Sequence, residues 1–249
     1  MKFSTKDSRH VAVQEGFREQ QLVKLDEFFL FNRVRIRRII GTLLRNSWLQ
    51  LFNPHLRSKR YLNLGCGGNL LRDFINLDYM WKPGIDLCWN ITRSNPIPDH
   101  HLLGIFSEHV FEHFTWEFTY KRLLPECLRM LQPGGTIRII VPDAALAINL
   151  YTQAKQKGLV DKEFRESDPQ ALTPMMRVND TFRQIFVKNG FGHKFAYDFQ
   201  TLEFFLHRAG FVDIREESYM LGRDSRLLVD YRKRAHESLY IEASAPGQS

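Results

Sequence analysis

The sequence predicts an α/β fold, a doubly wound and mostly parallel seven-stranded sheet with a helical extension at the N-terminus. From residue 61 onward, short apolar runs alternate with helical stretches, which is the pattern of a parallel sheet covered by helices. The first run leads into a glycine-rich turn, YLNLGCGGN at 61–69. Before residue 60 the chain is helical and basic instead. A chain of 249 residues has room for one such domain and an extension.

The order of the elements follows from hydrophobic periodicity along the chain. The expected strands are residues 61–64, 74–77, 85–88, 104–107, 136–141, 211–216 and 239–243. Helices are expected near 10–30, 115–131, 143–157 and 199–209. Residues 158–198 form one long insertion, and long loops in compact domains are usually lids or substrate-binding segments. We therefore expect a basic helical extension at 1–57 and one α/β domain at 58–249.

Composition excludes several classes of protein. With 43% hydrophobic and 25% charged residues, the chain has the composition of a globular protein and not of a disordered one. The three cysteines, Cys66, Cys88 and Cys127, form no CxxC pair, which fits a reducing compartment better than a disulfide scaffold. There is no signal-like N-terminus and no run of about 18 uncharged apolar residues. We expect a cytoplasmic protein.

The extension carries the basic charge of the chain. Residues 1–60 hold 13 Lys or Arg against 5 Asp or Glu, whereas the remainder holds 22 against 23. Residues 33–52 follow a helical period, in which the apolar face comprises Ile36, Ile40, Leu43, Leu44, Trp48 and Leu51 and the residues turned away are Arg35, Arg38 and Arg45. Three interpretations stay open: packing on the domain or on a second copy in a homodimer, peripheral contact with an anionic membrane at its inner face, and nucleic-acid binding. The nearly neutral domain disfavours nucleic acid.

The glycine-rich turn and an acid after the second expected strand are the first candidate site residues. Gly65 and Gly67 allow the backbone to turn with positive φ and to lie against a ligand. In a doubly wound sheet, this turn lies at the crevice where cofactors bind. Asp78 ends FINLD thirteen residues after Gly65, where a carboxylate can accept hydrogen bonds from ribose hydroxyls. An ordinary tight turn and a solvated strand-end acid are the alternatives.

Four features in a fixed order carry a resemblance to a known family. They are LNLGCGG at 62–68, the acid Asp78, SEHVFEH at 107–113 and LQPGGTIRIIVPD at 131–143. Together they resemble the class I S-adenosylmethionine-dependent methyltransferases of the type 11 group, over Tyr61 to about Pro246. Residues 193–211 and 234–246 are similar to a subset found among bacterial polysaccharide-biosynthesis enzymes.

The resemblance implies a Rossmann-like methyltransferase fold that binds S-adenosylmethionine. The glycine turn would hold the amino-acid end of the cofactor, Asp78 its ribose, and Asn90 with Ile91 its adenine. The implied cofactor contacts are Asn63, Gly65, Cys66, Gly67, Asn69, Asp78, Asn90, Ile91 and Ser107. Two departures from the family stand out: Asn63 replaces an acid, and the connection between the first two strands is short. Cys66 is expected to contribute its backbone and not a reactive thiol.

Histidines supply the candidate catalytic groups. His109 and His193 are candidates for a general base, because an imidazole titrates near neutral pH. The alternative for His193 is that it anchors the insertion. His109, Glu112 and His113 also form H-x-x-E-H, an inverted zinc-protease signature, and the two histidines would be i and i+4 on a helix. That motif needs a further ligand downstream, so we expect no metal here.

The expected reaction is methyl transfer by in-line displacement, with the protein supplying alignment and exclusion of water. The resemblance favours O-methylation of a sugar hydroxyl on a bacterial surface glycan or glycolipid. The alternatives are methylation of RNA or of a small metabolite, a non-catalytic methyltransferase-like scaffold, and a metallohydrolase that uses His109 and His113.

Overall fold

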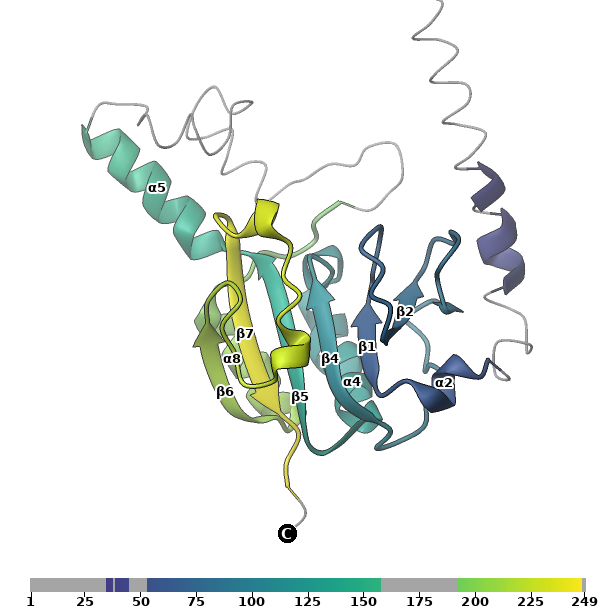
Figure 1. Ribbon diagram of the computed structural model, residues 1–249. Coiled ribbons are helices and arrows are strands. Elements are labelled where there is room, and N and C mark those ends of the chain that lie inside the picture. The colour runs from purple at the N-terminus through teal and green to yellow at the C-terminus, as the bar shows by residue number, and fades with distance from the viewer. Residues whose placement is uncertain (1–34, 38, 45–52, 158–191, 248–249) are drawn as a thin grey trace, which may run out of the picture.

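The computed structural model describes residues 35–37, 39–44, 53–157 and 192–247. Its centre is a seven-stranded sheet with the strand order β3-β2-β1-β4-β5-β7-β6 (Figure 1). The pairings from β3 across to β5 are parallel, and β7 runs antiparallel to both β5 and β6. This arrangement confirms the predicted α/β fold class.

The seven strands lie where the apolar runs predicted them. Their bounds are β1 Tyr61–Leu64, β2 Phe74–Asp78, β3 Leu87–Cys88, β4 Leu102–Glu108, β5 Leu131–Pro142, β6 Val212–Glu217 and β7 Ser238–Ser244. The helices are α2 His55–Ser58, α3 Trp116–Phe118, α4 Leu124–Met130, α5 Ala144–Lys157 and α8 Phe199–Ala209. Short turns of 3-10 helix occur at Phe111–His113, Ser225–Leu227 and Arg232–Arg234.

The helix expected at 115–131 is interrupted. Between α3 and α4 the segment Thr119–Leu123 is π-helical. Pro125 lies at the start of α4, and proline has no N–H with which to continue the α-helical ladder. A local π turn takes up the mismatch, as is common where an α-helix is disturbed.

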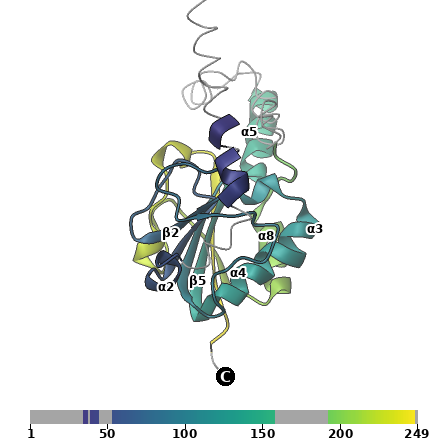
Figure 2. The same cartoon turned by 90° about the vertical axis from the view of Figure 1, so that its right-hand side faces the viewer.

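Two apolar clusters cover the two faces of the sheet. On one side α3, α4 and α8 lie together (Figure 2), and the larger cluster includes Leu62, Leu64 and Ile105 from the strands. On the other side, Tyr61 and Phe106 pack with Leu227 of the segment before β7. This second face lacks long helices in the described residues because the connections that follow β1, β2 and β3 are short. All four residues of β1 are buried, as expected for a central parallel strand.

A buried charged cluster joins the antiparallel edge to the rest of the sheet. Arg138 on β5 donates from Nε and Nη2 to the two carboxylate oxygens of Asp230, at 2.8 and 2.6 Å. Its Nη1 donates to Glu242 Oε1 at 2.9 Å, and Glu242 is its register partner on β7. The carbonyls of Ser218 and Leu221 accept the remaining bonds. The side chains of Arg138, Asp230 and Glu242 have no exposed surface.

The described part of the basic extension is helical at 35–37 and 39–44. One point at which it approaches the domain is Gly41, whose carbonyl lies 3.8 Å from Cys88 Sγ. Ile36, Ile39 and Leu43 are exposed. The rest of 33–52 and the expected helix at 10–30 lie outside the described residues, as does most of the insertion, and contact with a membrane or a second copy stays a prediction.

No helix within the described ranges is both long and apolar enough to cross a membrane.

Candidate functional site

The chain changes direction across the sheet at the carboxyl ends of β1 and β4. After β1 it builds β2 and β3 on one side, and then crosses back to add β4 on the other side of β1. Ligands in open α/β sheets bind in the crevice outside such a switch point. The glycine turn follows β1 directly, so this crevice is where the candidate residues meet.

The glycine turn has no space for a side chain at Gly65. Gly65 and Gly67 have φ of +68° and +51°, in the left-handed region that favours glycine. A Cβ added at Gly65 would lie 2.4 Å from Cγ2 of Val110. A Cβ at Gly67 would meet only the carbonyl oxygen of Gly65, at 3.9 Å. The turn is therefore packed tightly against Val110 at Gly65 and open at Gly67, where a ligand can approach the backbone.

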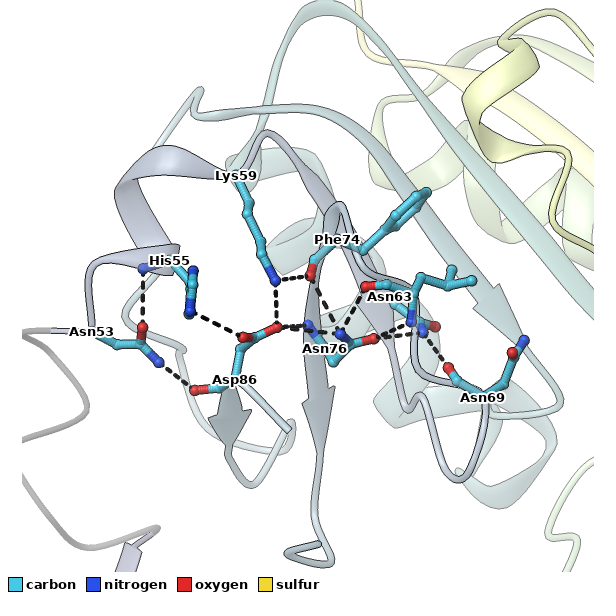
Figure 3. Close-up of polar contacts among 9 residues, drawn as sticks. Asn53, His55, Lys59, Asn63, Asn69, Phe74, Asn76 and Asp86 are labelled. Atoms are coloured by element: carbon cyan, nitrogen blue, oxygen red, sulfur yellow. Dashed lines mark hydrogen bonds and ion pairs between the residues drawn. The ribbon is translucent and has the colours of Figure 1, made fainter. Parts of the chain in front are cut away.

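A row of buried amides and one carboxylate holds this turn in place (Figure 3). Asn63 Nδ2 donates to the carbonyl of Asn69 at 2.7 Å and to Asn76 Oδ1 at 3.0 Å. Asp86 Oδ2 accepts from the backbone N–H of Asn76 at 2.8 Å and from Lys59 Nζ at 2.9 Å. Asn63 therefore closes the glycine turn through its bond to Asn69. Asn76, itself held by Asp86, fixes the side chain of Asn63.

Asp78 links the end of β2 to the same turn. Its Oδ2 accepts from the backbone N–H of Gly67 at 2.8 Å, and its Oδ1 accepts from that of Met80 at 2.7 Å. An ionised carboxylate offers about four acceptor positions, so about two stay available for a ligand. Asp78 lines a cavity, as a ribose-binding acid must.

Two cavities meet at the turn, and both include Gly65, Gly67 and His109 in their walls. The first, of about 430 Å³, is lined by Gly65, Gly67, Asp78, Tyr79, Met80, Asn90, Ile91, Thr92, His109, Val110, His113, Phe114 and Lys194. The second, of about 480 Å³, is lined by Asn63, Gly65, Cys66, Gly67, Gly68, Asn69, Phe106, Glu108, His109, Tyr231 and Arg234. Volumes of a few hundred Å³ are typical of small-molecule sites.

The structure brings eight of the nine expected cofactor positions to these cavities. Asn63, Gly65, Cys66, Gly67, Asn69, Asp78, Asn90 and Ile91 all line one or both. Ser107 does not. It is fully buried in β4, and its Oγ has no hydrogen-bond partner among the described residues. The side chain of Ser107 therefore faces the interior of the domain, and the backbone contact that the resemblance implies near Ser107 stays a prediction.

Cys66 should react slowly with alkylating reagents, although it lines the second cavity. Burial raises the pKa of its thiol to about 12, and the thiolate is the nucleophile. At pH 8 the thiolate is then on the order of one part in ten thousand. Iodoacetamide labelling followed by peptide mass spectrometry should leave Cys66 unmodified in native protein and modified in urea. Rapid native labelling at Cys66 would show that the thiol is activated.

Of the two candidate general bases, His109 reaches the crevice and His193 does not. His109 lines both cavities, and its Nε2 lies 2.9 Å from the hydroxyl of Ser238. Burial, together with the charge of Arg234, lowers the pKa of His109 to about 2, so the ring is neutral at physiological pH and is a weaker base than a free imidazole. His193 has a side chain only 3% exposed and lies beside Glu112.

The H-x-x-E-H segment does not form the helical pair considered from sequence. His109 has a φ of +52° and precedes the 3-10 turn Phe111–His113, so His109 and His113 are not successive residues of one helix face. Glu112 lies between them instead, with its Oε1 3.7 Å from His109 Nδ1 and 3.9 Å from His113 Nε2.

Several lining residues were not predicted from the sequence. Lys194 enters the first cavity because its backbone N–H donates to the carbonyl of Glu112 at 2.7 Å. Arg234 and Tyr231 reach the second cavity from the segment before β7. Lys194 and Arg234 come from distant parts of the chain, and no local pattern marks them. The position of Glu108 could have been predicted from the sequence, because Glu108 ends β4 at the switch point of the sheet.

No protein-family profile matches the chain, and no curated protein does either. The chain is similar to solved structures at low identity. One is a SAM-dependent methyltransferase from Archaeoglobus fulgidus, 20% identical, covering 87% of this chain and 99% of that one with a TM-score of 0.44. Another is a possible exported protein from Bordetella parapertussis, with 15% identity, coverages of 83% and 67% and a TM-score of 0.47. A third is the Burkholderia thailandensis 1,6-didemethyltoxoflavin-N1-methyltransferase, with 12% identity, coverages of 99% and 92% and a TM-score of 0.42.

The class of fold follows from the chain's own strand order. Five parallel-paired strands, an antiparallel β7 inserted between β5 and β6, and a glycine turn after β1 make up a Rossmann-like methyltransferase fold.

Proposed function

We propose that the chain is an S-adenosylmethionine-dependent methyltransferase. The observation that carries this proposal is the juxtaposition of an open glycine turn and the Asp78 carboxylate in one cavity at the switch point of the sheet. The space beside Gly67, which a Cβ would occupy without a clash, is a place where a ligand can lie against the backbone. The donor and acceptor chemistry around it suits a nucleoside with a charged amino-acid tail.

Each part of the cofactor has a partner in this proposal. Asp78 accepts hydrogen bonds from the ribose hydroxyls, and Asn90 and Ile91 frame the adenine in the same cavity. The amino-acid end lies along the turn toward the second cavity, where the guanidinium of Arg234 attracts its carboxylate. The Nδ2 of Asn63 is committed to Asn69 and Asn76, which leaves its Oδ1 to accept from the ammonium group.

His109 is the proposed general base for a hydroxyl acceptor. When bound, the cofactor supplies a methyl group on a positively charged sulfur that is a good leaving group. The chain's own task is to align the acceptor oxygen and to take its proton. His109 lines both cavities, where an acceptor oxygen can reach it, whereas His193 lies deeper beside Glu112. We therefore favour His109 over His193, the second candidate from the sequence.

The proposed acceptor is a sugar hydroxyl of a bacterial surface glycan or glycolipid. Its support is the resemblance of residues 193–211 and 234–246 to polysaccharide-associated methyltransferases. Those two segments bring Lys194 and Arg234 to the cavities. RNA, a small metabolite and a non-catalytic scaffold are the alternatives. Extracts of strains with and without the gene, incubated with methyl-labelled cofactor and compared by mass spectrometry, distinguish these outcomes by the molecule that carries the label.

Replacing Asp78 with alanine tests the cofactor site. The variant loses charged acceptors for the ribose and should bind S-adenosylhomocysteine about 1–3 kcal/mol more weakly. Isothermal titration calorimetry measures the change. Asp73→Ala is the matched control, because Asp73 is exposed in the same connection between β1 and β2. Equal affinities of the Asp78 variant and wild type would assign the ribose to another residue.

A further inference from the structure

Three side chains with metal-binding atoms converge beside the first cavity. Glu112 Oε1 lies 3.9 Å from His113 Nε2 and 3.8 Å from His193 Nε2. One ligand atom from each of the three falls within 4.8 Å of the others. The convergence comes from the backbone, since the N–H groups of Lys194 and Phe195 both donate to the carbonyl of Glu112 and so hold His193 against the 3-10 turn. We call Glu112, His113 and His193 the donor set.

The carboxylate of Glu112 has no hydrogen-bond partner within the described residues. The residue is 1% exposed, and neither Oε1 nor Oε2 is bonded. Burying a carboxyl group without partners costs several kcal/mol in an apolar medium, so native proteins rarely leave one this way. A cation held between the carboxylate and the two imidazoles would resolve this cost.

We propose that the donor set binds one divalent transition-metal ion, with Zn²⁺ as the best match. Imidazole nitrogen and carboxylate oxygen are the ligands that zinc takes in open sites, at about 2.0–2.2 Å from the ion. Glu112 Oε1 lies 3.8–3.9 Å from both imidazole nitrogens, so small side-chain rotations can bring the three ligand atoms to that geometry. His113 also has the outer contact expected of a metal ligand, because its Nδ1 faces the carbonyl of Gly192 at 3.5 Å.

The third ligand is what the sequence motif lacked. From sequence, His109 and His113 were the candidate pair and no downstream ligand was evident, which is why no metal was expected. The fold replaces His109 with Glu112 itself and supplies His193 from the end of the insertion. Three protein ligands leave at least one coordination position for water or a substrate oxygen. Because His113 also lines the first cavity, the ion would lie at the wall of that cavity.

Some charged groups near the donor set would attract a bound cation and others would repel it. Glu108 and Glu237 add negative potential at Glu112, whereas Arg234 opposes it. Lys194 is a cation in the wall of the first cavity. The two imidazole nitrogens of the donor set favour an ion that forms directional bonds to imidazole over a hard, oxygen-seeking ion such as Mg²⁺.

The test is metal binding by the full-length chain after removal of metals with EDTA. Equilibrium dialysis against Zn²⁺ with elemental analysis should give about one zinc per chain. Glu112→Gln and His193→Ala should each weaken binding by at least about tenfold, as expected when a ligand is lost. His207→Ala is the control, since His207 is exposed on α8 and should leave zinc binding unchanged. Wild-type protein without zinc, or variants with wild-type affinity, would overturn the proposal.

Two further measurements keep the test decisive if a variant folds poorly. Zn²⁺ should raise the thermal midpoint of wild-type protein relative to EDTA, because an ion that binds only the folded state stabilises it. His113→Ala, at a partly exposed side chain, should abolish that shift while the circular dichroism stays native. Binding of S-adenosylhomocysteine is measured on the same samples. Wild-type protein that binds the nucleoside but no zinc contradicts the metal site, and wild-type protein that binds zinc but not the nucleoside contradicts the proposed function.

Discussion

Replacing Arg138 with methionine should remove a large part of the folding stability of the protein. The substitution leaves the carboxylates of Asp230 and Glu242 buried together without a cation. Breaking a buried ion pair by removing one partner typically costs about 3–5 kcal/mol, because the remaining charge keeps its desolvation penalty. Total stabilities of domains are about 5–15 kcal/mol, so the variant should unfold at much lower denaturant concentration.

Urea unfolding followed by circular dichroism measures the loss. Arg72→Met is the matched control, because Arg72 is exposed and should change stability by about 0.5 kcal/mol or less. If Arg138→Met and Arg72→Met unfold at the same urea concentration, the buried cluster does not stabilise the antiparallel edge of the sheet.

Replacing Gly65 with valine should abolish cofactor binding. The new Cβ would lie 2.4 Å from Cγ2 of Val110, and φ of +68° is itself unfavourable for a branched residue. The turn must then move away from Val110, which removes the geometry shared by both cavities. We expect the affinity for S-adenosylhomocysteine to fall by at least about 100-fold, equivalent to about 2.7 kcal/mol.

Gly134→Val separates the collision from the backbone strain. Gly134 has a φ of +77°, and an added Cβ there meets nothing within 4 Å. Both variants therefore carry a similar backbone cost, and only Gly65→Val should lose the ligand in calorimetry. Retained binding in Gly65→Val would show that the turn after β1 is not part of the cofactor site.

The fold could be predicted because its signals are local. Strands buried on both faces are continuous apolar runs, such as β1 and the apolar part of β5, and a glycine turn marks where the first one ends. The position of Asp78 in the cavity wall was also predictable, because Asp78 ends β2. Seven further positions expected from the resemblance line the cavities as well, since they lie at or just after strand ends that a parallel sheet brings to one edge.

The remaining features depend on contacts between distant segments. Arg138 was part of a strand motif, but its pairing with Asp230 spans 92 residues and has no local signature. Ser107 has a polar side chain at a strand position that faces the interior. His193 was expected at the end of an insertion, and only the hydrogen bonds of Lys194 and Phe195 to Glu112 show that it joins the donor set.

Titrating the wild-type, full-length chain with S-adenosylhomocysteine tests the central claim most directly. Calorimetry should give about one site per chain, and S-adenosylmethionine should compete for it, because both share the nucleoside and the amino-acid tail that the turn and Asp78 are proposed to hold. The same titration with adenosine should bind more weakly, since it lacks the tail that reaches Arg234. A chain that is folded by circular dichroism and yet shows no saturable binding of either nucleoside would contradict the account.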